Sequence, residues 1–108
     1  SMNRFKQTQL GQEQILDFAQ KALEVRFGAE QTQNITIDLR ELITPTRDED
    51  RGSDLWSVFN VVQEKLMHGM FNYQTGTKMR KARKIKNFKQ DIELNAKLFE
   101  LANEYAVN

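Results

Sequence analysis

Residues that interrupt regular secondary structure are scarce in this chain. Its 108 residues include one proline and five glycines. Because glycine and proline mark most turns, so few of them favour a few long helices over many short strands. The sequence therefore predicts a mainly α-helical fold, a small bundle of about four helices.

Two amphipathic segments carry the strongest helix signals. Across residues 12–27 apolar side chains recur at three- and four-residue spacing, ending at Val25 or Phe27, and Gly28 follows where a C-cap favours glycine. Residues 54–68 repeat this pattern, with Ser53 as the expected N-cap and Gly69 as the expected end. The expected inner face of this second helix consists of Leu55, Phe59, Val62 and Leu66.

Two further helices have weaker signals. Thr36 is expected to cap a short helix with Asp38 in its first turn, and Pro45 is expected to stop that helix. Asn87 and Gln90 resemble a capping box that opens a last helix. The inward-facing residues expected in these two helices are Leu39, Leu42 and Ile43, and Ile92, Asn95, Leu98, Phe99, Ala102 and Tyr105.

The segment before the last helix has no helical period. Phe71, Tyr73, Thr75 and Thr77 flank Gly76, so a weak hairpin and an irregular arm are equally compatible with residues 71–85. Because this segment precedes the last helix, the predicted bundle carries a basic arm or a weak hairpin between its last two helices.

Length and composition fit one domain across residues 3–108, with Ser1 set aside because it resembles a scar of tag cleavage. The chain has no cysteine, which excludes disulfides and thiolate metal sites. It contains neither an apolar run of about 18 residues nor a signal-peptide segment. We therefore expect a cytoplasmic protein with no membrane partner.

The charges are unevenly distributed along the chain. The formal net charge is only +1, but seven basic residues and no acidic residue fall within residues 78–89. The other nine basic residues stand against all fifteen acidic ones, so the rest of the chain carries a charge of −6. The basic residues of the run are Lys78, Arg80, Lys81, Arg83, Lys84, Lys86 and Lys89.

This basic run suggests a nucleic-acid partner. Cations bind phosphates, and the flanking aromatic residues Tyr73 and Phe88 could stack on unpaired bases, which favours single-stranded DNA. About six such contacts would give a log–log salt slope of roughly −4. The alternatives are a solvated arm, or a basic surface that binds an acidic face of its own chain or of a partner protein.

Catalytic and metal-binding patterns are missing from the sequence. His68 is the only histidine, so the usual nucleophile–base pairs cannot be built. The acidic residues Asp48, Glu49, Asp50 and Asp54 do not have calcium-loop spacing, because Gly52 stands fifth rather than sixth from Asp48. We therefore expect no catalytic residue, no metal and no cofactor, and the sequence predicts a protein that is not an enzyme.

Polar residues lie next to the apolar stripe of residues 54–68. Asn60 and Glu64 are four residues apart, and Gln63 lies between them, so they could share one helix face. Bonding between helices is favoured over ligand binding for this polar group. Trp56 is expected to anchor the core, as large aromatic residues at such positions usually do.

The same segment resembles a known family. Leu55-Trp56, Phe59-Asn60, Gln63-Glu64 and Gly69 follow the motif order of domain-of-unknown-function family 932. A basic stretch at residues 78–86 and a last helix with Asn95 continue the resemblance, through the further matches Asp91, Leu98-Phe99 and Leu101-Ala102. The sequence departs from the pattern at Lys65, where the family usually has Asn, and at Met70, where it often has a second Gly.

The resemblance implies a context for the domain. Members of this family are commonly several hundred residues long with this motif toward the C-terminus, which implies the C-terminal part of a longer phage- or plasmid-like protein in a bacterial host cell. The family pattern also marks Asn60, Gln63, Glu64 and Asn95 as a polar face. The function expected is an accessory role in DNA replication or recombination. The alternative is a protein-interaction module that engages a host protein, or the rest of its own chain, through the basic arm.

Overall fold

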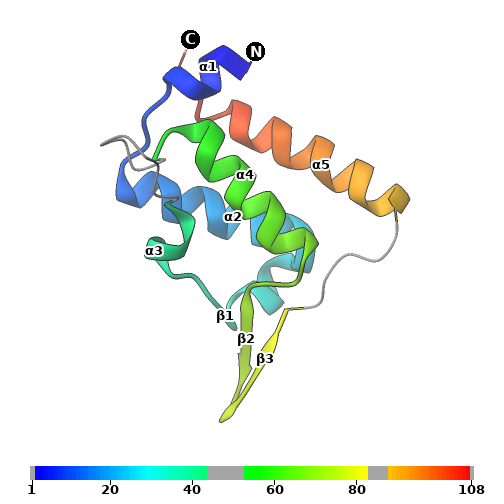
Figure 1. Ribbon diagram of the computed structural model, residues 1–108. Helices are drawn as coiled ribbons and strands as arrows, with labels where there is room; N and C mark the ends of the chain where they lie inside the picture. The colour runs from blue at the N-terminus through cyan, green and yellow to red at the C-terminus, as the bar shows by residue number, and fades with distance from the viewer. Residues whose placement is uncertain (1, 44–52, 83–87, 108) are drawn as a thin grey trace.

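The computed structural model describes residues 2–43, 53–82 and 88–107, and these ranges contain five helices and one three-stranded antiparallel sheet (Figure 1). The elements are α1 (Met2–Gln7), α2 (Gln12–Thr32), β1 (Ile35–Thr36), α3 (Leu39–Leu42), α4 (Leu55–Met67), β2 (Asn72–Thr75), β3 (Lys78–Lys81) and α5 (Phe88–Asn103). The mainly helical prediction is confirmed, but the predicted bundle of about four helices omitted α1 and the strand β1, which adds a third strand to the expected hairpin.

Helices α2, α4 and α5 pack against one another and enclose the core. The predicted inner face of α4 is correct, because Leu55, Phe59, Val62 and Leu66 are all buried. The apolar stripe of α2 lies opposite them, and its buried side chains are Ile15, Phe18, Ala19, Ala22 and Leu23. Spacing at three and four residues thus selects the faces that lose contact with water.

The sequence does not predict helix α1, because its six residues contain too few apolar side chains to show a helical period. Its position depends on Phe5, which is fully buried against α4 and α5. The Phe5 ring lies 5.0 Å from Phe99 and 6.1 Å from Phe59, measured between centroids. Trp56 stacks on Phe59 at 6.1 Å, so the prediction that Trp56 anchors the core is confirmed.

The two ends of the described chain meet beside α1 (Figure 1). The Arg4 side chain donates a hydrogen bond from Nε to the carbonyl oxygen of Val107 at 2.9 Å. The Val107 amide donates in turn to the Thr8 hydroxyl oxygen at 2.9 Å. These bonds fix the N-terminal segment to the residues that follow α5.

Two predicted caps are wrong by one or two residues. Asp38, not Thr36, caps α3 by accepting a hydrogen bond from the Arg40 amide, and Thr36 lies in β1. Asp54, not Ser53, caps α4 by accepting from the Ser57 amide at 3.1 Å. The carboxylates are favoured because they complement the positive end of the helix dipole as well as the free amides.

The predicted break at Gly28 is correct in position, but the helix resumes after it. Gly28 has φ 84° and ψ 158°, a backbone conformation that favours glycine, and residues 29–32 form one more helical turn. The Thr32 hydroxyl donates to the Gly28 carbonyl oxygen at 2.8 Å and closes that turn. The kink therefore redirects the end of α2 towards the sheet.

The inner face of the last helix was predicted only in part. Leu98 and Ala102 are buried as expected, whereas Ile92 is 55% exposed and Phe99 is 38% exposed. Leu94 and Leu101 take the inward positions instead. The α5 helix ends at Asn103, so Tyr105 lies beyond it, and the expected capping residue Asn87 lies outside the described residues.

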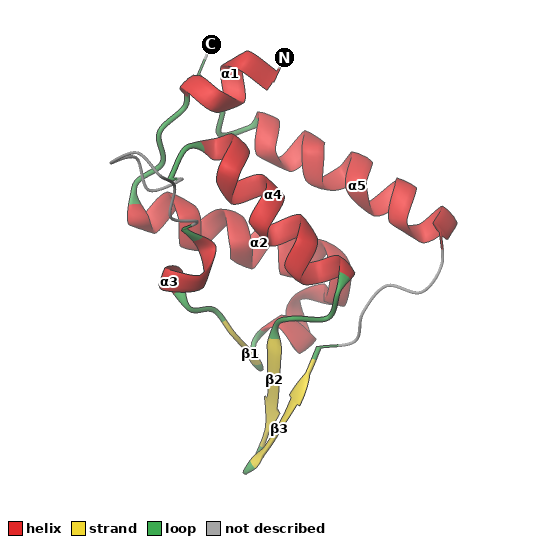
Figure 2. Ribbon diagram, in the orientation of Figure 1, coloured by secondary structure: helices red, strands yellow, loops and turns green. Residues whose placement is uncertain are grey.

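The segment predicted as a weak hairpin or an irregular arm is a hairpin. Strands β2 and β3 pair antiparallel with Thr75 opposite Lys78, so Gly76 and Thr77 form a two-residue turn. β1 pairs with the other side of β2 and places β2 at the centre of the sheet. The hairpin projects from the helical body at the end away from α1 (Figure 2).

Candidate nucleic-acid interface

The base of the hairpin is fixed in the core. Phe71 is 3% exposed and Ala82 is 5% exposed, and the Ala82 amide donates to the Phe71 carbonyl oxygen at 2.7 Å. The Gln74 amide donates to the carbonyl oxygen of Asn34, just before β1, at 2.9 Å. Burial and backbone hydrogen bonds therefore fix the position at which β2 and β3 leave the helical body.

Strand register sorts the hairpin side chains onto two faces. Tyr73 lies directly opposite Arg80, and Lys78 lies two residues before Arg80, so these three belong to one face. Met79 and Lys81 belong to the other face. Lys78, Arg80 and Lys81 are all exposed, and Tyr73 is half-buried.

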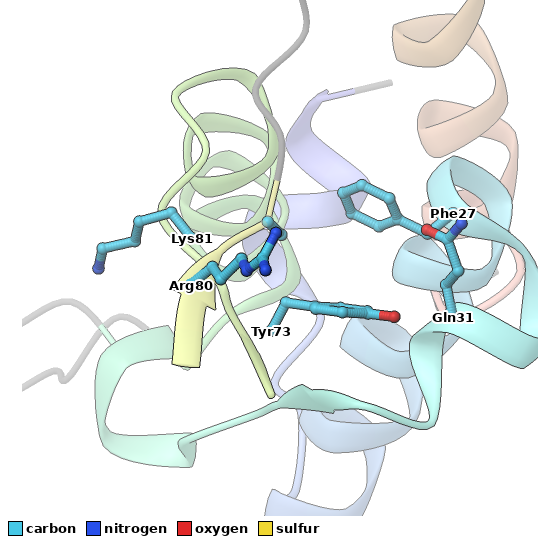
Figure 3. Close-up of a pocket in the computed structure, with 6 residues that line it drawn as sticks. Phe27, Gln31, Tyr73, Arg80 and Lys81 are labelled. Atoms are coloured by element: carbon cyan, nitrogen blue, oxygen red, sulfur yellow. The ribbon is translucent and has the colours of Figure 1, made fainter. Parts of the chain in front are cut away.

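The face that carries Tyr73 and Arg80 looks onto the end of α2. A pocket of about 360 Å³ lies there, lined by Phe27, Gln31, Tyr73, Arg80, Lys81 and Ala82. In Figure 3 the Arg80 side chain extends along the Tyr73 side of the pocket, whereas the Lys81 side chain points away from it. The structure thus joins an aromatic ring, a guanidinium group and an amide in one open pocket.

The opposite face of the hairpin has a different composition. A second pocket, of about 440 Å³, is lined there by Glu41, Val61, Glu64, Lys65, Met70, Asn72 and Lys81. Lys65 forms an ion pair with Glu41 at 2.8 Å and lies over the Phe71 ring at 4.9 Å from its centroid. With two carboxylates among its lining residues, this face is less suited to phosphates than the face that carries Tyr73 and Arg80.

Other members of the predicted basic site are outside these contacts. Arg83, Lys84 and Lys86 lie outside the described residues. Phe88 and Lys89 open α5, and their side chains are not described. Among the described residues, the candidate interface therefore consists of the hairpin with Tyr73, Lys78, Arg80 and Lys81, together with the end of α2.

The predicted polar face is divided between several environments. Gln63 donates a hydrogen bond from Nε2 to the Asn95 Oδ1 atom at 2.9 Å, which joins α4 to α5. Asn60 donates from Nδ2 to the Trp56 carbonyl oxygen at 2.9 Å within α4. Glu64 is exposed and lines the second pocket with Lys81. The structure brings together Gln63 and Asn95, and it does not gather the four residues on one surface.

Of the pocket residues, the sequence does not predict Ala82 or the two side chains that α2 contributes, Phe27 and Gln31. Phe27 was one of two alternatives for the end of an apolar stripe, and Gln31 stood in a segment without a periodic signal. The approach of α2 to a hairpin more than forty residues later is a tertiary contact. The sequence does mark Gly28, but a glycine at this position predicts the end of a helix and not a kink within one.

Metal clusters and membrane-spanning helices are both absent from the residues that the structure describes. In the ranges that the structure covers, no group of three or more His, Cys, Asp or Glu side chains is arranged to hold a metal ion. Asp48, Glu49 and Asp50 lie outside those ranges. None of the helices described combines the length and the apolar character required to cross a bilayer.

The arrangement defines a small helical domain with a projecting basic hairpin. Residues 1–99 match domain-of-unknown-function family 932 (DUF932), and the chain belongs to this family. The match includes α1, the sheet and most of α5, so the family pattern covers nearly all the elements described. No solved structure is significantly similar to the chain.

Proposed function

We propose that this domain binds nucleic acid, with single-stranded DNA as the preferred ligand, through the hairpin β2–β3. One observation carries the proposal: Tyr73 lies opposite Arg80 on a projecting hairpin, two residues from the exposed Lys78. An unpaired strand offers both partners that this face requires, a base for the aromatic ring and phosphates for the cations.

The fixed base of the hairpin supports this proposal. Because Phe71 and Ala82 are buried and hydrogen-bonded to each other, the strands keep their direction before a ligand arrives. A binding surface that is ordered in advance loses less conformational entropy on association. The Tyr73–Arg80 pair is therefore preorganised, although the hairpin tip is exposed to water.

Single strands are preferred for a geometric reason. In a duplex the bases are stacked and paired, so Tyr73 would have no free base face and only phosphate contacts would remain. Stacking on an aromatic side chain contributes about 1–3 kcal/mol per base in single-strand complexes. A duplex of the same length should therefore bind more weakly.

The biological role we propose is an accessory one in DNA replication or recombination of a phage or plasmid. It rests on the family resemblance of the motif segment and on the basic run. In the sequence, Arg83, Lys84, Lys86 and Lys89 continue the run beyond β3, with Phe88 as a further aromatic residue. We include these residues in the proposed site on the basis of the sequence alone.

Fluorescence anisotropy with a labelled single-stranded oligonucleotide, measured across a salt series, tests the proposal. Each phosphate contact contributes roughly −0.7 to the log–log slope, so replacing Lys78 and Arg80 by glutamine should make the slope shallower by about 1.4. The loss of affinity should be similar for all base sequences, because phosphate contacts do not read sequence.

The matched control replaces Lys6 and Lys97, exposed residues of α1 and α5, by glutamine. It removes the same net charge but leaves the hairpin unchanged, so its slope should equal that of the unmodified protein. Absence of binding at low salt, or an affinity indifferent to salt, would overturn the proposal. An equal effect in both double variants would show that only overall charge matters.

A second function is favoured by the position of β3. This strand is the last in the sheet order, so within the described residues its outer edge has no neighbouring strand. An exposed edge can pair with an extended segment of another chain, and the exposed cations of β3 would favour an acidic one. The partner would be a host protein or another part of the same longer chain. Stoichiometric co-purification of a protein without nucleic acid would favour this function.

A further inference from the structure

The pocket between α2 and the hairpin has features that phosphate binding does not require. Its walls come from two elements far apart in the sequence, the last turns of α2 and the paired strands β2 and β3. Phosphate contacts need only exposed cations, which Lys78 already provides at the hairpin surface. The pocket instead presents two aromatic rings and a carboxamide beside the guanidinium of Arg80.

Two aromatic rings define the walls of the pocket. Tyr73 from β2 and Phe27 from α2 lie on either side of the open space in Figure 3, with the Tyr73 ring seen edge-on. Both rings are half-buried, so each keeps part of its surface available. Planar apolar walls of this kind suit a flat aromatic ligand.

Contacts within the end of α2 hold its two pocket residues in place. The Arg26 guanidinium lies over the Phe27 ring, with its Cζ atom 4.8 Å from the ring centroid, and thereby covers part of that ring. The kink at Gly28 and the Thr32–Gly28 hydrogen bond set the direction of the last helical turn, which carries Gln31. Phe27 and Gln31 therefore reach the same pocket from opposite sides of the kink.

The Gln31 side chain adds hydrogen-bonding capacity. It is exposed and lines the pocket together with Phe27 and Tyr73, and in Figure 3 its amide end is drawn next to Phe27. A carboxamide offers a donor and an acceptor side by side. The edges of the nucleobases present complementary donors and acceptors, which glutamine pairs with when it reads adenine.

We infer that this pocket receives one unpaired nucleobase of the bound strand. The base lies against Tyr73 and Phe27, its edge meets the Gln31 amide, and Arg80 binds the phosphate of the same nucleotide. This inference rests on the proposed function and goes beyond it, because it assigns Phe27 and Gln31 to ligand binding. A volume of about 360 Å³ falls in the range of small-ligand pockets.

Oligonucleotides with and without bases test the inference. Anisotropy is measured with a labelled 12-nucleotide strand and with a strand of equal length whose sites are all abasic, so that the phosphates are the same. The unmodified protein should bind the intact strand about 5- to 150-fold more tightly, the range expected from stacking of one base. Tyr73→Leu should bring this ratio close to one and leave the salt slope unchanged.

Gln31→Ala is the second variant, because an exposed helical residue can be replaced without disturbing the hairpin. It should lower affinity for the intact strand about fivefold, the equivalent of one hydrogen bond, and leave affinity for the abasic strand unchanged. Gln20→Ala is the matched control, since Gln20 is also an exposed glutamine of α2 but does not line the pocket.

The possible outcomes separate the inference from the proposed function. Weaker binding of the intact strand by Tyr73→Leu, with full affinity in Gln31→Ala, would overturn the inference and leave the proposed function standing, because that function needs a base against Tyr73 but no contact with α2. Equal, salt-dependent binding of intact and abasic strands would overturn the inference together with the base contact of Tyr73, and would leave only phosphate binding by the hairpin. Failure of both strands to bind at low salt would overturn both.

Discussion

At the scale of single residues, position in the fold separates side chains that join two helices from side chains that are exposed on the hairpin. Gln63 and Asn95 both belong to the motif segments that resemble the family. The Gln63 side chain donates a hydrogen bond from Nε2 to Asn95 Oδ1 at 2.9 Å, between α4 and α5. Arg80 and Lys78 are exposed on the hairpin, where a ligand can reach them. Gln63 and Asn95 therefore contribute to the packing of α4 against α5, and the exposed hairpin cations have the place that the proposed phosphate contacts require.

Asn95→Ala tests this assignment. The substitution leaves the half-buried Gln63 amide without its Asn95 partner, which should lower the free energy of unfolding by about 1 kcal/mol. Affinity for single-stranded DNA should not change. Urea unfolding and anisotropy measure the two effects, with Glu100→Ala on the exposed side of α5 as the control. Weakened DNA binding by a folded Asn95→Ala protein would place the polar residues in the interface instead.

Tyr105 links the end of the chain to α2 and makes stability depend on pH. Its hydroxyl donates a hydrogen bond to Asp17, and this bond, with Lys21 at 3.2 Å, holds the pKa of the Asp17 carboxyl below its usual value. Burial and the nearby Asp17 carboxylate raise the pKa of Tyr105. A carboxyl whose pKa is lowered by folding stabilises the fold above its ordinary pKa, near 4, and loses that effect as pH falls.

Tyr105→Phe should therefore destabilise the protein at pH 7 by less than about 1 kcal/mol, because the Asp17 side chain is half exposed and screened by water. Near pH 2.5 the difference between variant and unmodified protein should shrink, since protonated Asp17 is a weaker acceptor. The Phe ring retains the edge contact with Phe18. Urea unfolding at the two pH values decides the question, and an equal difference at both would contradict the argument.

At the scale of secondary-structure elements, the long helices were predictable and the short elements were not. Residues 12–27 and 54–68 extend over several turns, enough for periodic burial to define a face. Helix α1 has six residues and β1 has two, and both exist because larger elements hold them: Phe5 enters the aromatic cluster, and Ile35 pairs with Tyr73. Such tertiary causes leave no local pattern in the sequence.

The candidate site likewise has a part that the sequence predicts and a part that depends on tertiary contacts. Tyr73, Lys78, Arg80 and Lys81 were predicted because aromatic residues and a basic run are visible in the sequence. Which of these residues share a face is known only from the strand register, which places Arg80 and Lys81 on opposite faces of the hairpin. The contribution of α2 to the pocket required the fold itself, since neither Gln31 nor the turn after Gly28 carries a recognisable motif.

The turn of the hairpin provides a prediction at the level of the element. Gly76 has φ 59°, in the left-handed region, and nothing lies within 4 Å of the position that a Cβ atom would take. Gly76→Ala should therefore act through backbone strain alone, at a cost of about 1 kcal/mol. Gly76→Asn should cost less, because asparagine adopts this conformation more readily.

Amide hydrogen exchange in β2 and β3 measures the stability of the hairpin. Exchange should accelerate in the order unmodified protein, Gly76→Asn, Gly76→Ala, while the core amides of α2 and α4 stay protected. Affinity for single-stranded DNA should fall in the same order, because the Tyr73–Arg80 pair depends on the register of the strands. A variant with a loosened hairpin and full affinity would contradict this dependence.

At the scale of the whole molecule, the net charge of +1 averages a basic run and an acidic remainder. The hairpin that carries the start of the basic run projects from one end of the molecule, and the two ends of the described chain meet at α1 on the other (Figure 1). A charge gradient of this kind orients an approaching polyanion towards the hairpin. The proposed binding surface and the residues that join the two ends of the described chain therefore lie at opposite ends of the structure.

The location of the bound strand is the most direct test of the account. Backbone amide chemical shifts of the isotopically labelled protein are recorded while an unlabelled single-stranded oligonucleotide is added. The account predicts that the largest changes fall on residues 72–82 and on Phe27 and Gln31 of α2, with α1 unaffected. Changes concentrated on α1 or on the exposed face of α5, or no change at low salt, would contradict it.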